Sequence, residues 1–443
     1  MLFRLEIMGV SFLQNVRETE IPVWIEKSRE GTYFEVPFEV PDDVERLEIS
    51  YDYRRRDFRQ EGGSEYDPEI NIVDLAVRDE TGGFRGASGS ERKEIYFTEN
   101  EATPGYLCGK IGKGTWALVL GAYRIAREGC SVKVRIRAAF RHRVLLKGDL
   151  HLHTWNSDGK YSVEDVEKAA RLHGMDFIFL TDHNTFSQND QIHSSDALVV
   201  LPGMEWTHYR GHANFLGVKR PVERIFANDK KTVSSIFREA EKRGAMVILN
   251  HPFCRFCPWK WGFDVPFDGV EIWNGPMKES EYDAIRWWDE QLKKGRKLPA
   301  VGGSDAHRSE LFRMIGTPTD FVYSDSRGAS DIMKAIRGGS LFISYIPEGP
   351  TIDLKAGGAS MGGTAPSPDV RSGVLKIGRI RPGDTVRLIS NRGVEKELTI
   401  RNQSAETMDF RAEGRKYFRA EVWRTLFPGV TALASISNPV YLI

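Results

Sequence analysis

Histidine and carboxylate residues close several short apolar segments in the middle of this chain. The series begins with Asp149-Leu150-His151-Leu152-His153 and ends with Ser304-Asp305-Ala306-His307. A single His-X-His motif can arise by chance. A series of such residues, each at the end of a predicted buried strand, indicates a site for several metal ions, because imidazole and carboxylate groups are typical metal ligands.

Residues 144–346 alternate between continuous apolar runs and amphipathic helices, which is typical of parallel β/α units. We expect one helix capped by Ser162 and closed by Gly174, one from Thr232 to Gly244, and one over 279–294. The predicted strands are 144–150, 176–180, 197–201, 214–218, 245–249, 269–273 and 300–303. The fold class is therefore α/β, and these strands favour a small, distorted seven-stranded (β/α) barrel.

The regions on either side of this barrel differ from it. Both contain alternating strand patterns, such as 131–137 and 396–400, separated by Gly, Asn, Asp and Pro turns. We expect three domains: an N-terminal β-sandwich over residues 1–143, the barrel over 144–346 and a smaller β domain over 347–443.

The carboxyl ends of barrel strands meet at one mouth. The predicted fold would therefore gather six histidines and three carboxylates, which are His151, His153, Asp158, His183, Glu205, His212, His251, Asp305 and His307. Repulsion and desolvation make such a cluster costly without bound cations. His208 competes with His212, but the Gly211-His212 run into a strand favours His212.

The charges of this cluster predict the kind of ligand. The three carboxylates supply −3 and three divalent ions would supply +6, so the filled site is net positive and favours an anion such as a phosphate ester. Imidazole mixed with carboxylate suits zinc, iron or manganese.

The same motifs resemble the polymerase-and-histidinol-phosphatase (PHP) family of metal-dependent hydrolases. The resemblance covers the middle half of the chain and implies a distorted seven-stranded β/α barrel. The flanking β regions and Ala102-Thr103-Pro104-Gly105-Tyr106 look like the branch that contains carbaryl-hydrolase-like metallohydrolases. The matching motifs are Asp149-Leu150-His151-Leu152-His153, Ser157-Asp158-Gly159, Thr181-Asp182-His183-Asn184, Gly203-Met204-Glu205, Gly211-His212, Asn250-His251-Pro252 and Ser304-Asp305-Ala306-His307.

The resemblance implies three metal positions. The implied ligands are His151, His153, Glu205 and Asp305 for the first, Glu205, His212 and His251 for the second, and Asp158, His183 and His307 for the third. Many family members have a histidine where Asp158 stands here, and an oxygen ligand would weaken the third position. We therefore expect two or three divalent ions.

The ligand set implies a metal-bridging hydroxide as nucleophile, with the ions stabilising the charge that develops. A protonated histidine or a third ion would assist the leaving oxygen. The residues expected to act in catalysis are His151, His153, Glu205, His251, Asp305 and His307.

Two arginines are candidates for binding an anionic substrate. Arg255 lies in the aromatic loop after the fifth predicted strand, and Arg308 follows His307, with Arg313 close behind. The competing interpretations are solvated arginines and a loop that packs its own tryptophans. Asp182 is a candidate for orienting an imidazole.

Four cysteines are too few for a disulfide framework. Cys254 and Cys257 have C-X-X-C spacing, but a structural zinc site needs four ligands and no second pair exists. We expect both to be buried or rim thiols without a function.

The leading hypothesis for function is a metal-dependent phosphoesterase that cleaves a phosphate mono- or diester. A second keeps the metal centre and hydrolyses a carbamate, ester or amide. A third is a non-catalytic protein that binds carbohydrate or protein and has a vestigial metal site.

Charge and hydropathy patterning limit the partners. The formal net charge of zero argues against nucleic-acid binding. No apolar run is long enough to span a membrane, and residues 1–7 interrupt their apolar stretch with charges, which is unlike a secretory signal. We expect a cytoplasmic protein with a small anionic substrate and no nucleic-acid or membrane partner, whose oligomeric state stays open.

Overall fold

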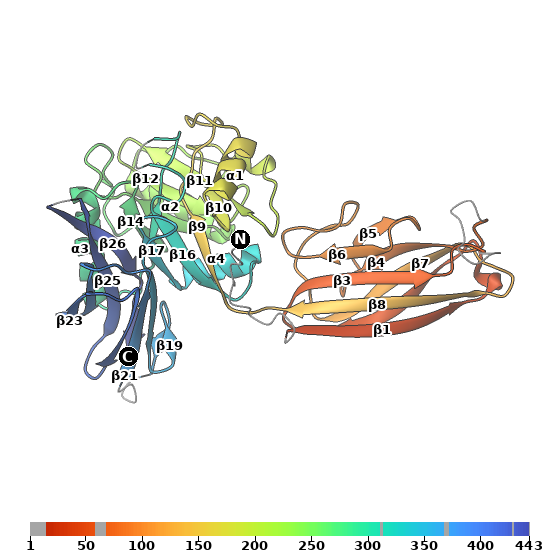
Figure 1. Ribbon diagram of the computed structural model, residues 1–443. Helices are drawn as coiled ribbons and strands as arrows, with labels where there is room; N and C mark the ends of the chain where they lie inside the picture. The colour runs from red at the N-terminus through yellow and green to blue at the C-terminus, as the bar shows by residue number, and fades with distance from the viewer. Residues whose placement is uncertain (1–14, 58–67, 311–312, 367–371, 428, 443) are drawn as a thin grey trace, which may run out of the picture. The chain divides into compact units, whose positions relative to one another are not determined.

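The computed structural model describes residues 15–57, 68–310, 313–366, 372–427 and 429–442 (Figure 1). The N-terminal stretch interpreted as lacking a secretory signal lies outside them. The chain divides into two compact units, Met1–His142 and Arg143–Ile443. The further division at residue 346 stays a prediction.

The first unit contains two four-stranded antiparallel sheets. Strand β8 buries every second side chain, because successive side chains of a strand point to opposite faces. Side chains of both sheets, among them Ile136 and Leu118, share one core. One sheet has the order β1 (Val16–Ile25), β8 (Cys130–Phe140), β3 (Val44–Tyr53), β6 (Glu94–Phe97), and the other β2 (Tyr33–Val40), β7 (Gly114–Arg124), β4 (Ile72–Arg78), β5 (Phe84–Ser88). The short helix η1 (Lys27–Arg29) follows β1.

The second unit is built on a 15-stranded sheet. Seven neighbouring strands have the order β15 (Ala300–Gly303), β14 (Gly269–Asn274), β13 (Met246–Asn250), β12 (Gly211–Leu216), β11 (Val199–His208), β10 (Phe177–Leu180), β9 (Val144–Asp149). Just beyond the two end strands, Leu152 and Ala306 form a parallel bridge and Asp305 N donates to the carbonyl of His151 at 2.9 Å. The two ends of this path therefore meet where the metal-capable residues follow the strands.

Strand β12 departs from the predicted parallel pattern. The pairs β9–β10, β10–β11, β13–β14 and β14–β15 are parallel, but β12 is antiparallel to both of its neighbours. Only Tyr209 and Arg210 connect β11 to β12, and so short a connection allows antiparallel pairing alone. The prediction of parallel units throughout is wrong here.

The expected strand limits 197–201 and 214–218 are also wrong. Strand β11 continues to His208, and β12 begins at Gly211. Glu205 and His212 consequently lie within strands instead of in loops. The sequence did not predict the second half of β11 as strand, because the polar residues Glu205, Thr207 and His208 interrupt the apolar run.

The sheet continues beyond β9 into the C-terminal region. The further strands are, in order, β16 (Thr319–Ser324), β17 (Leu341–Ser344), β26 (Val430–Ser437), β25 (Tyr417–Phe427), β22 (Thr385–Ser390) and β23 (Gly393–Thr399), with β27 (Val440–Leu442) and β20 (Thr364–Ala365) at the side. A second sheet has the order β19 (Ala359–Ser360), β18 (Thr351–Ala356), β21 (Ser372–Gly378), β24 (Ala405–Arg411).

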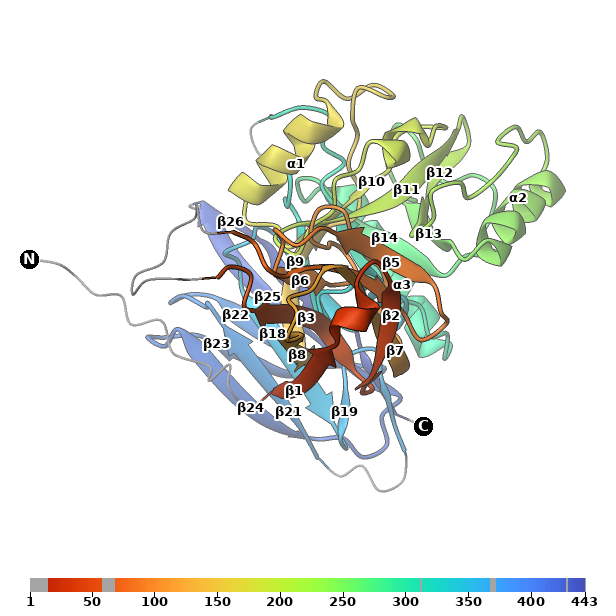
Figure 2. The same ribbon diagram turned by 90° about the vertical axis from the view of Figure 1, so that its right-hand side faces the viewer.

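The helices connect strands of the second unit. Helix α1 (Val163–Leu172) is capped as predicted, since Ser162 Oγ accepts from Asp165 N at 3.0 Å. Helix α2 (Lys230–Lys242) starts two residues before Thr232, because the Asp229 carboxylate caps it. Helix α2 packs on β13 (Figure 2), and α3 (Glu279–Lys293) and α4 (Ala329–Arg337) pack on β14 and β16. The prediction for α3 is confirmed to within one residue, and η2 (Ser187–Asp190) follows β10.

None of the helices among the described residues combines the length and apolar character that crossing a bilayer requires.

Asn438 ties the C-terminal segment to β15. Its side chain, only 1% exposed, donates to the Ala300 carbonyl at 2.7 Å and accepts from Ala300 N at 2.9 Å. It also donates to the Leu341 carbonyl of β17 at 3.2 Å. The Asn438 amide therefore provides hydrogen-bond partners for both backbone groups of Ala300, in the strand that leads to Asp305.

Replacing this amide should destabilise the second unit. Asn438→Ala leaves buried backbone groups of Ala300 unpaired, and we expect a loss of about 1–3 kcal/mol in the free energy of unfolding. Urea denaturation followed by tryptophan fluorescence measures it. The exposed residue Asn402 supplies the control, because Asn402→Ala should change the stability by less than about 0.5 kcal/mol. Equal stabilities of the two variants would contradict the role of Asn438.

Candidate metal centre

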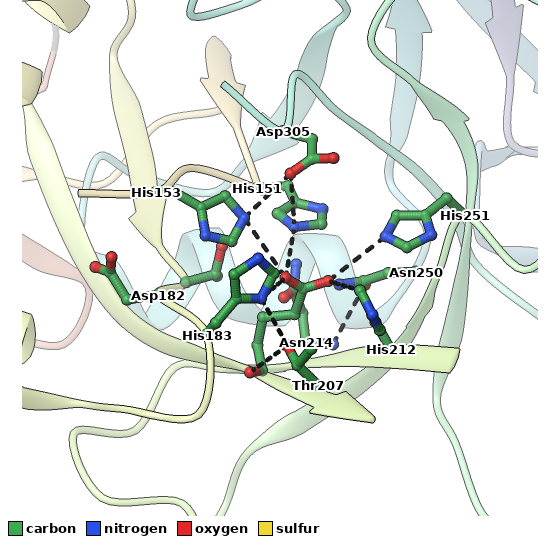
Figure 3. A network of polar contacts seen from close by, with 12 residues as sticks. His151, His153, Asp182, His183, Thr207, His212, Asn214, Asn250, His251 and Asp305 are labelled. Carbon is green, nitrogen blue, oxygen red and sulfur yellow. Dashed lines mark hydrogen bonds and ion pairs between the residues drawn. The ribbon is translucent and has the colours of Figure 1, made fainter. Parts of the chain in front are cut away.

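All nine residues singled out in the sequence lie in one cluster of the second unit. Five follow the ends of strands β9, β10, β13 and β15. Glu205 and His212 lie on the two paired strands of the β11–β12 hairpin, two positions apart in register. Asp158 and His307 lie in the loops that follow β9 and β15. The imidazoles of His151, His153, His183 and His251 point toward a common centre (Figure 3).

Glu205 is the common neighbour of the cluster, and its side chain is 0% exposed. Its Oε2 lies 3.4 Å from His151 Nε2, 3.5 Å from His153 Nε2 and 2.7 Å from His183 Nδ1. Its Oε1 lies 3.1 Å from His212 Nδ1 and 3.5 Å from His251 Nε2. One buried carboxylate is therefore surrounded by five imidazoles.

Asp305 completes one side of the cluster. Its Oδ1 lies 3.1 Å from His153 Nε2 and 3.5 Å from His151 Nε2. His307 turns Nδ1 toward the Asp305 backbone carbonyl at 2.9 Å. The first set of predicted ligands is thus assembled around Glu205 and Asp305.

A second carboxylate lies on the open side. Asp158 Oδ1 is 3.2 Å from His307 Nε2, 3.7 Å from His183 Nε2 and 4.0 Å from His153 Nδ1. The Asp158 side chain is 59% exposed, whereas those of His151 and His153 are almost completely buried. Access from solvent is therefore through the Asp158 side.

Several buried atoms of the cluster lack a hydrogen bond of suitable geometry within the described chain. They are His151 Nε2, His153 Nδ1, His153 Nε2 and Glu205 Oε2. Unpaired buried polar atoms are costly, so a group that engages them is expected. Ligand atoms around a tetrahedral zinc ion bonded at about 2.0–2.2 Å lie roughly 3.3–3.6 Å apart. The separations of 3.4 and 3.5 Å from Glu205 to His151 and His153 fit that geometry.

Three further side chains orient the cluster, and sequence reasoning missed them. Glu271 Oε1 lies 3.0 Å from His151 Nδ1, and its Oε2 accepts from His251 N at 2.8 Å. Thr207 Oγ1 lies 2.6 Å from His183 Nδ1, and Asn250 Nδ2 donates to Glu205 Oε1 at 2.8 Å. For Glu271 a signal existed: it is a charged residue inside the apolar run of β14, where burial demands a partner.

Asp182 was expected to orient an imidazole, but its carboxylate accepts hydrogen bonds from the loop after β9. It accepts hydrogen bonds from Thr154 N and Oγ1 at 2.8 Å each and from Ser157 Oγ at 2.7 Å. That loop carries Asp158. Asp182 therefore positions the exposed carboxylate instead of an imidazole.

The clustered charges shift the ionisation of the ligands. Burial disfavours the charged form of His151, but Glu205, Glu271 and Asp305 outweigh it and raise its pKa well above the usual value. Burial also opposes ionisation of Glu205, yet His151 and its other imidazole neighbours hold the pKa of that carboxyl well below normal. The pKa values of His183 and His251 are also raised by Glu205 against the effect of burial, whereas burial lowers the pKa of His153. Protons on His151, His183 and His251 thus balance the buried carboxylates.

The backbone is strained at the same place. His251 has φ 29°, Asp305 φ 54° and Asn184 φ 52°, in the left-handed region that residues other than glycine seldom adopt. Asn184 and His251 directly follow His183 and Asn250 in the chain. Such conformations persist where the surrounding structure holds them and cluster at functional sites.

Other predicted residues lie outside the cluster. His208 stacks on Trp206 and contacts Trp261 with its ring tilted. It takes no part in the groups of possible ligand atoms, so the preference for His212 agrees with the geometry. Trp259 and Trp261 are buried in the main core, which agrees with the interpretation of a loop that packs its own tryptophans.

The two arginines predicted to bind substrate are both exposed. Arg308 pairs with Glu310. Arg313 instead lies beside the cluster, with Nη1 3.7 Å from Asp305 Oδ2. Of the arginines considered in the sequence, Arg313 is the one in contact with a candidate ligand.

Cys257 lies beside the cluster and is half-buried, which agrees with the expectation of a rim thiol. Its Sγ lies 3.6 Å from His251 Nδ1 and 3.2 Å from Cys254 Sγ. Ligand atoms of His212, His251 and Cys257 all lie within 4.8 Å of one another. C-X-X-C spacing was the signal, but the sequence alone did not place these cysteines beside two histidines.

No family model matches the chain, and no curated protein matches it. Solved structures do resemble it. A two-domain protein of Bacteroides vulgatus containing a predicted PHP-like metal-dependent phosphoesterase is 21% identical, with 66% of this chain and 95% of that chain covered and a TM-score of 0.40. A protein of Bifidobacterium adolescentis described as a metal-dependent phosphoesterase is 16% identical (38% and 90% covered, TM-score 0.28). An amidohydrolase of Chromobacterium violaceum with bound sulfate and no metal is 15% identical (36% and 87% covered, TM-score 0.25).

These likenesses are too distant to transfer a function. The function proposed below therefore rests on the geometry of the cluster.

Glu271 should control metal affinity without being a ligand. Glu271→Gln keeps the shape but removes the charge that orients His151, and we expect roughly tenfold to hundredfold weaker binding. Competition with a chromophoric chelator measures the affinity for zinc. Glu279→Gln, an exposed carboxylate on α3, is the matched control and should bind as the wild type does. Unchanged affinity in the Glu271 variant would refute its positioning role.

Metal binding should release protons. Burial lowers the pKa of His251, but the hydrogen bond to Glu205 and the charge of Glu271 outweigh it and raise the pKa from 6.5 to about 9. The metal-free protein therefore holds this proton at neutral pH, and metal must displace it. We expect the apparent affinity to rise with pH up to about 9 and then level off. Calorimetric titration in buffers of different ionisation enthalpy counts the protons, and a pH-independent affinity without proton release would contradict this expectation.

Proposed function

We propose that this chain is a metal-dependent phosphoesterase of the PHP type that hydrolyses a phosphate mono- or diester. One observation carries the proposal: buried histidine and carboxylate atoms without hydrogen-bond partners lie around Glu205 at the separations of ligands that share an ion. Packing alone does not explain these buried charged groups, because apolar residues of similar volume would often make the folded protein equally or more stable.

The proposed ligands divide into three positions. The first is held by His151, His153, Glu205 and Asp305, the second by Glu205, His212 and His251, and the third by Asp158, His183 and His307. The exposure of Asp158 makes the third position the weakest, so the protein holds two or three ions of zinc, iron or manganese. When bound, such ions act as Lewis acids and lower the pKa of a coordinated water.

The chain's own residues would select an anion. Asp158, His307 and Arg313 form the open side, with side chains 59%, 27% and 28% exposed. Arg313 lies within reach of a phosphoryl oxygen placed over Asp305, and a guanidinium suits that role. Arg255 and Arg308 would meet only the outer parts of a substrate. Where the third position holds no ion, His307 is the partly exposed imidazole that would give a proton to the leaving oxygen.

The finer assignments belong to the same proposal. We interpret the closed path of seven strands as a distorted β/α barrel, the first unit as a β-sandwich and residues 347–443 as a smaller β domain. The carbaryl-hydrolase-like branch is proposed on the sequence layout. The partner is a small anionic substrate in the cytoplasm, with no nucleic acid and no membrane.

Removing a ligand should abolish turnover together with metal. His151→Ala takes away a buried atom that faces both Glu205 and Asp305, and we expect activity to fall by more than about a hundredfold, because outer partners alone are worth 10–100-fold. Activity on bis-nitrophenyl phosphate and metal content by mass spectrometry measure the effect. His193→Ala removes an exposed histidine and should change neither. Full activity in a metal-free His151 variant would refute the proposal.

The reaction class is tested with three substrates. We expect hydrolysis of nitrophenyl phosphate or bis-nitrophenyl phosphate, lost on chelation and restored by zinc, manganese or iron. Hydrolysis of nitrophenyl acetate alone would instead favour a carbamate, ester or amide hydrolase with the same centre. Stoichiometric metal without hydrolysis of any substrate would favour a binding protein with a vestigial site.

A further inference from the structure

Cys254 and Cys257 form a pair of thiols beside the cluster. They have C-X-X-C spacing, and their Sγ atoms lie 3.2 Å apart, with Cys257 donating to Cys254. The other two cysteines, Cys108 and Cys130, belong to the first unit. We propose that Cys254 and Cys257 are a redox-modification site, and that their reversible disulfide weakens metal binding at the neighbouring centre. The inference rests on the metal-dependent function proposed above.

The two sulfur atoms need little movement to join. A disulfide bond is about 2.0 Å long, so the Sγ atoms have to approach by roughly 1.2 Å from their separation of 3.2 Å. The chain already turns at this place, since Cys254 N donates to the His251 carbonyl at 2.8 Å. Trp259 N donates to the Pro252 carbonyl at 2.9 Å, which brings together the ends of the segment that carries both cysteines. The fold thus holds the two thiols within reach of each other.

A small oxidant has access to this pair. The two residues between the cysteines, Arg255 and Phe256, are exposed, and Phe256 is 93% exposed. Both cysteines are themselves partly exposed, whereas Cys130 is buried. Partly exposed thiols are the ones that react, and buried structural thiols are inert. The pair therefore lies where a soluble reagent meets it.

The oxidant required is a low-molecular-weight disulfide, and the reaction is thiol–disulfide exchange. The Cys254 sulfur, which accepts the hydrogen bond from Cys257, attacks one sulfur of the oxidant, whose disulfide bond breaks and releases one thiolate. The Cys257 sulfur then attacks Cys254 in the mixed disulfide and releases the second thiolate. The two protons lost by the cysteines end on these thiolates. Two protein thiols are thus oxidised to one disulfide, and the oxidant is reduced to two thiols.

His251 connects this pair to the metal centre. Cys257 Sγ lies 3.6 Å from His251 Nδ1, and the other ring nitrogen, Nε2, faces Glu205 Oε1 at 3.5 Å. Disulfide formation draws the Cys257 sulfur toward Cys254, so the His251 ring loses a neighbour that orients it. The backbone of His251, with φ 29°, is also strained and depends on the surrounding loop. Loss of an orienting partner weakens metal binding about tenfold or more.

Equilibration of the full-length protein with mixtures of reduced and oxidised glutathione tests disulfide formation. We expect Cys254 and Cys257 to be oxidised together, seen by mass spectrometry as a linked peptide that has lost two hydrogen atoms, and dithiothreitol should reverse the change. Cys254→Ser should abolish the link. Cys108→Ser, which alters an exposed cysteine of the first unit, should leave it intact. Thiols at 254 and 257 that stay unlinked at every glutathione ratio would overturn the inference.

Manganese binding tests the coupling to the centre. Manganese prefers oxygen ligands to thiolates, so a change in its affinity reports on the imidazoles and carboxylates instead of on the sulfur atoms. Electron paramagnetic resonance of free manganese measures the affinity, which we expect to be about tenfold or more weaker in the oxidised wild type than in the reduced one. Equal affinities of the two forms would contradict the role of His251 and with it the inference.

A double variant is the matched control. Cys254→Ser with Cys257→Ser keeps a hydroxyl beside His251 and cannot be oxidised, so its manganese affinity should be the same after both treatments. Circular dichroism verifies that it is folded. A redox-dependent affinity in a protein that hydrolyses no substrate would count against the proposed function alone. Hydrolysis of a phosphate ester by a protein whose affinity ignores oxidation would count against this inference alone.

Discussion

The Glu205 carboxylate is the constraint on which the centre depends. It is fully buried, and its neighbours are five imidazoles and the amide of Asn250. A buried carboxylate without compensating positive charge is strongly unfavourable. Protons on His151, His183 and His251 provide that charge in the metal-free chain, and cations provide it better, because they also engage the unpaired nitrogens. The fold is therefore arranged to be most stable when cations are present.

The sheet brings these groups together by simple geometry. Strand alternation places His151 and His153 on one side after β9, and the bridge between Leu152 and Ala306 sets Asp305 against them. The β11–β12 hairpin contributes Glu205 and His212 from within its strands. The strained φ angles at His251 and Asp305 show where the chain turns sharply to aim these side chains.

Much of this arrangement could be predicted from local patterns. Ser162 and Gly174 limit α1 as expected, and the strand-end histidines and carboxylates do lie together. The hairpin was missed because polar ligands replace apolar residues in the second half of β11. Glu271 was missed although it is a charged residue in an apolar strand, because its partner His151 is 120 residues away in the sequence. The C-X-X-C spacing was noted, but it does not show that Cys257 lies beside His251.

The amide of Asn438 has a consequence for biosynthesis. The Asn438 amide makes hydrogen bonds to the backbone N–H and carbonyl of Ala300 in β15. Strand β26, which immediately precedes Asn438, pairs with β17. Residues far along the chain therefore complete the central sheet around β15 and β17. During translation, β15 is made long before this partner has left the ribosome. The strand that leads to Asp305 is thus expected to reach its final packing only after residues 430–438 have been synthesised.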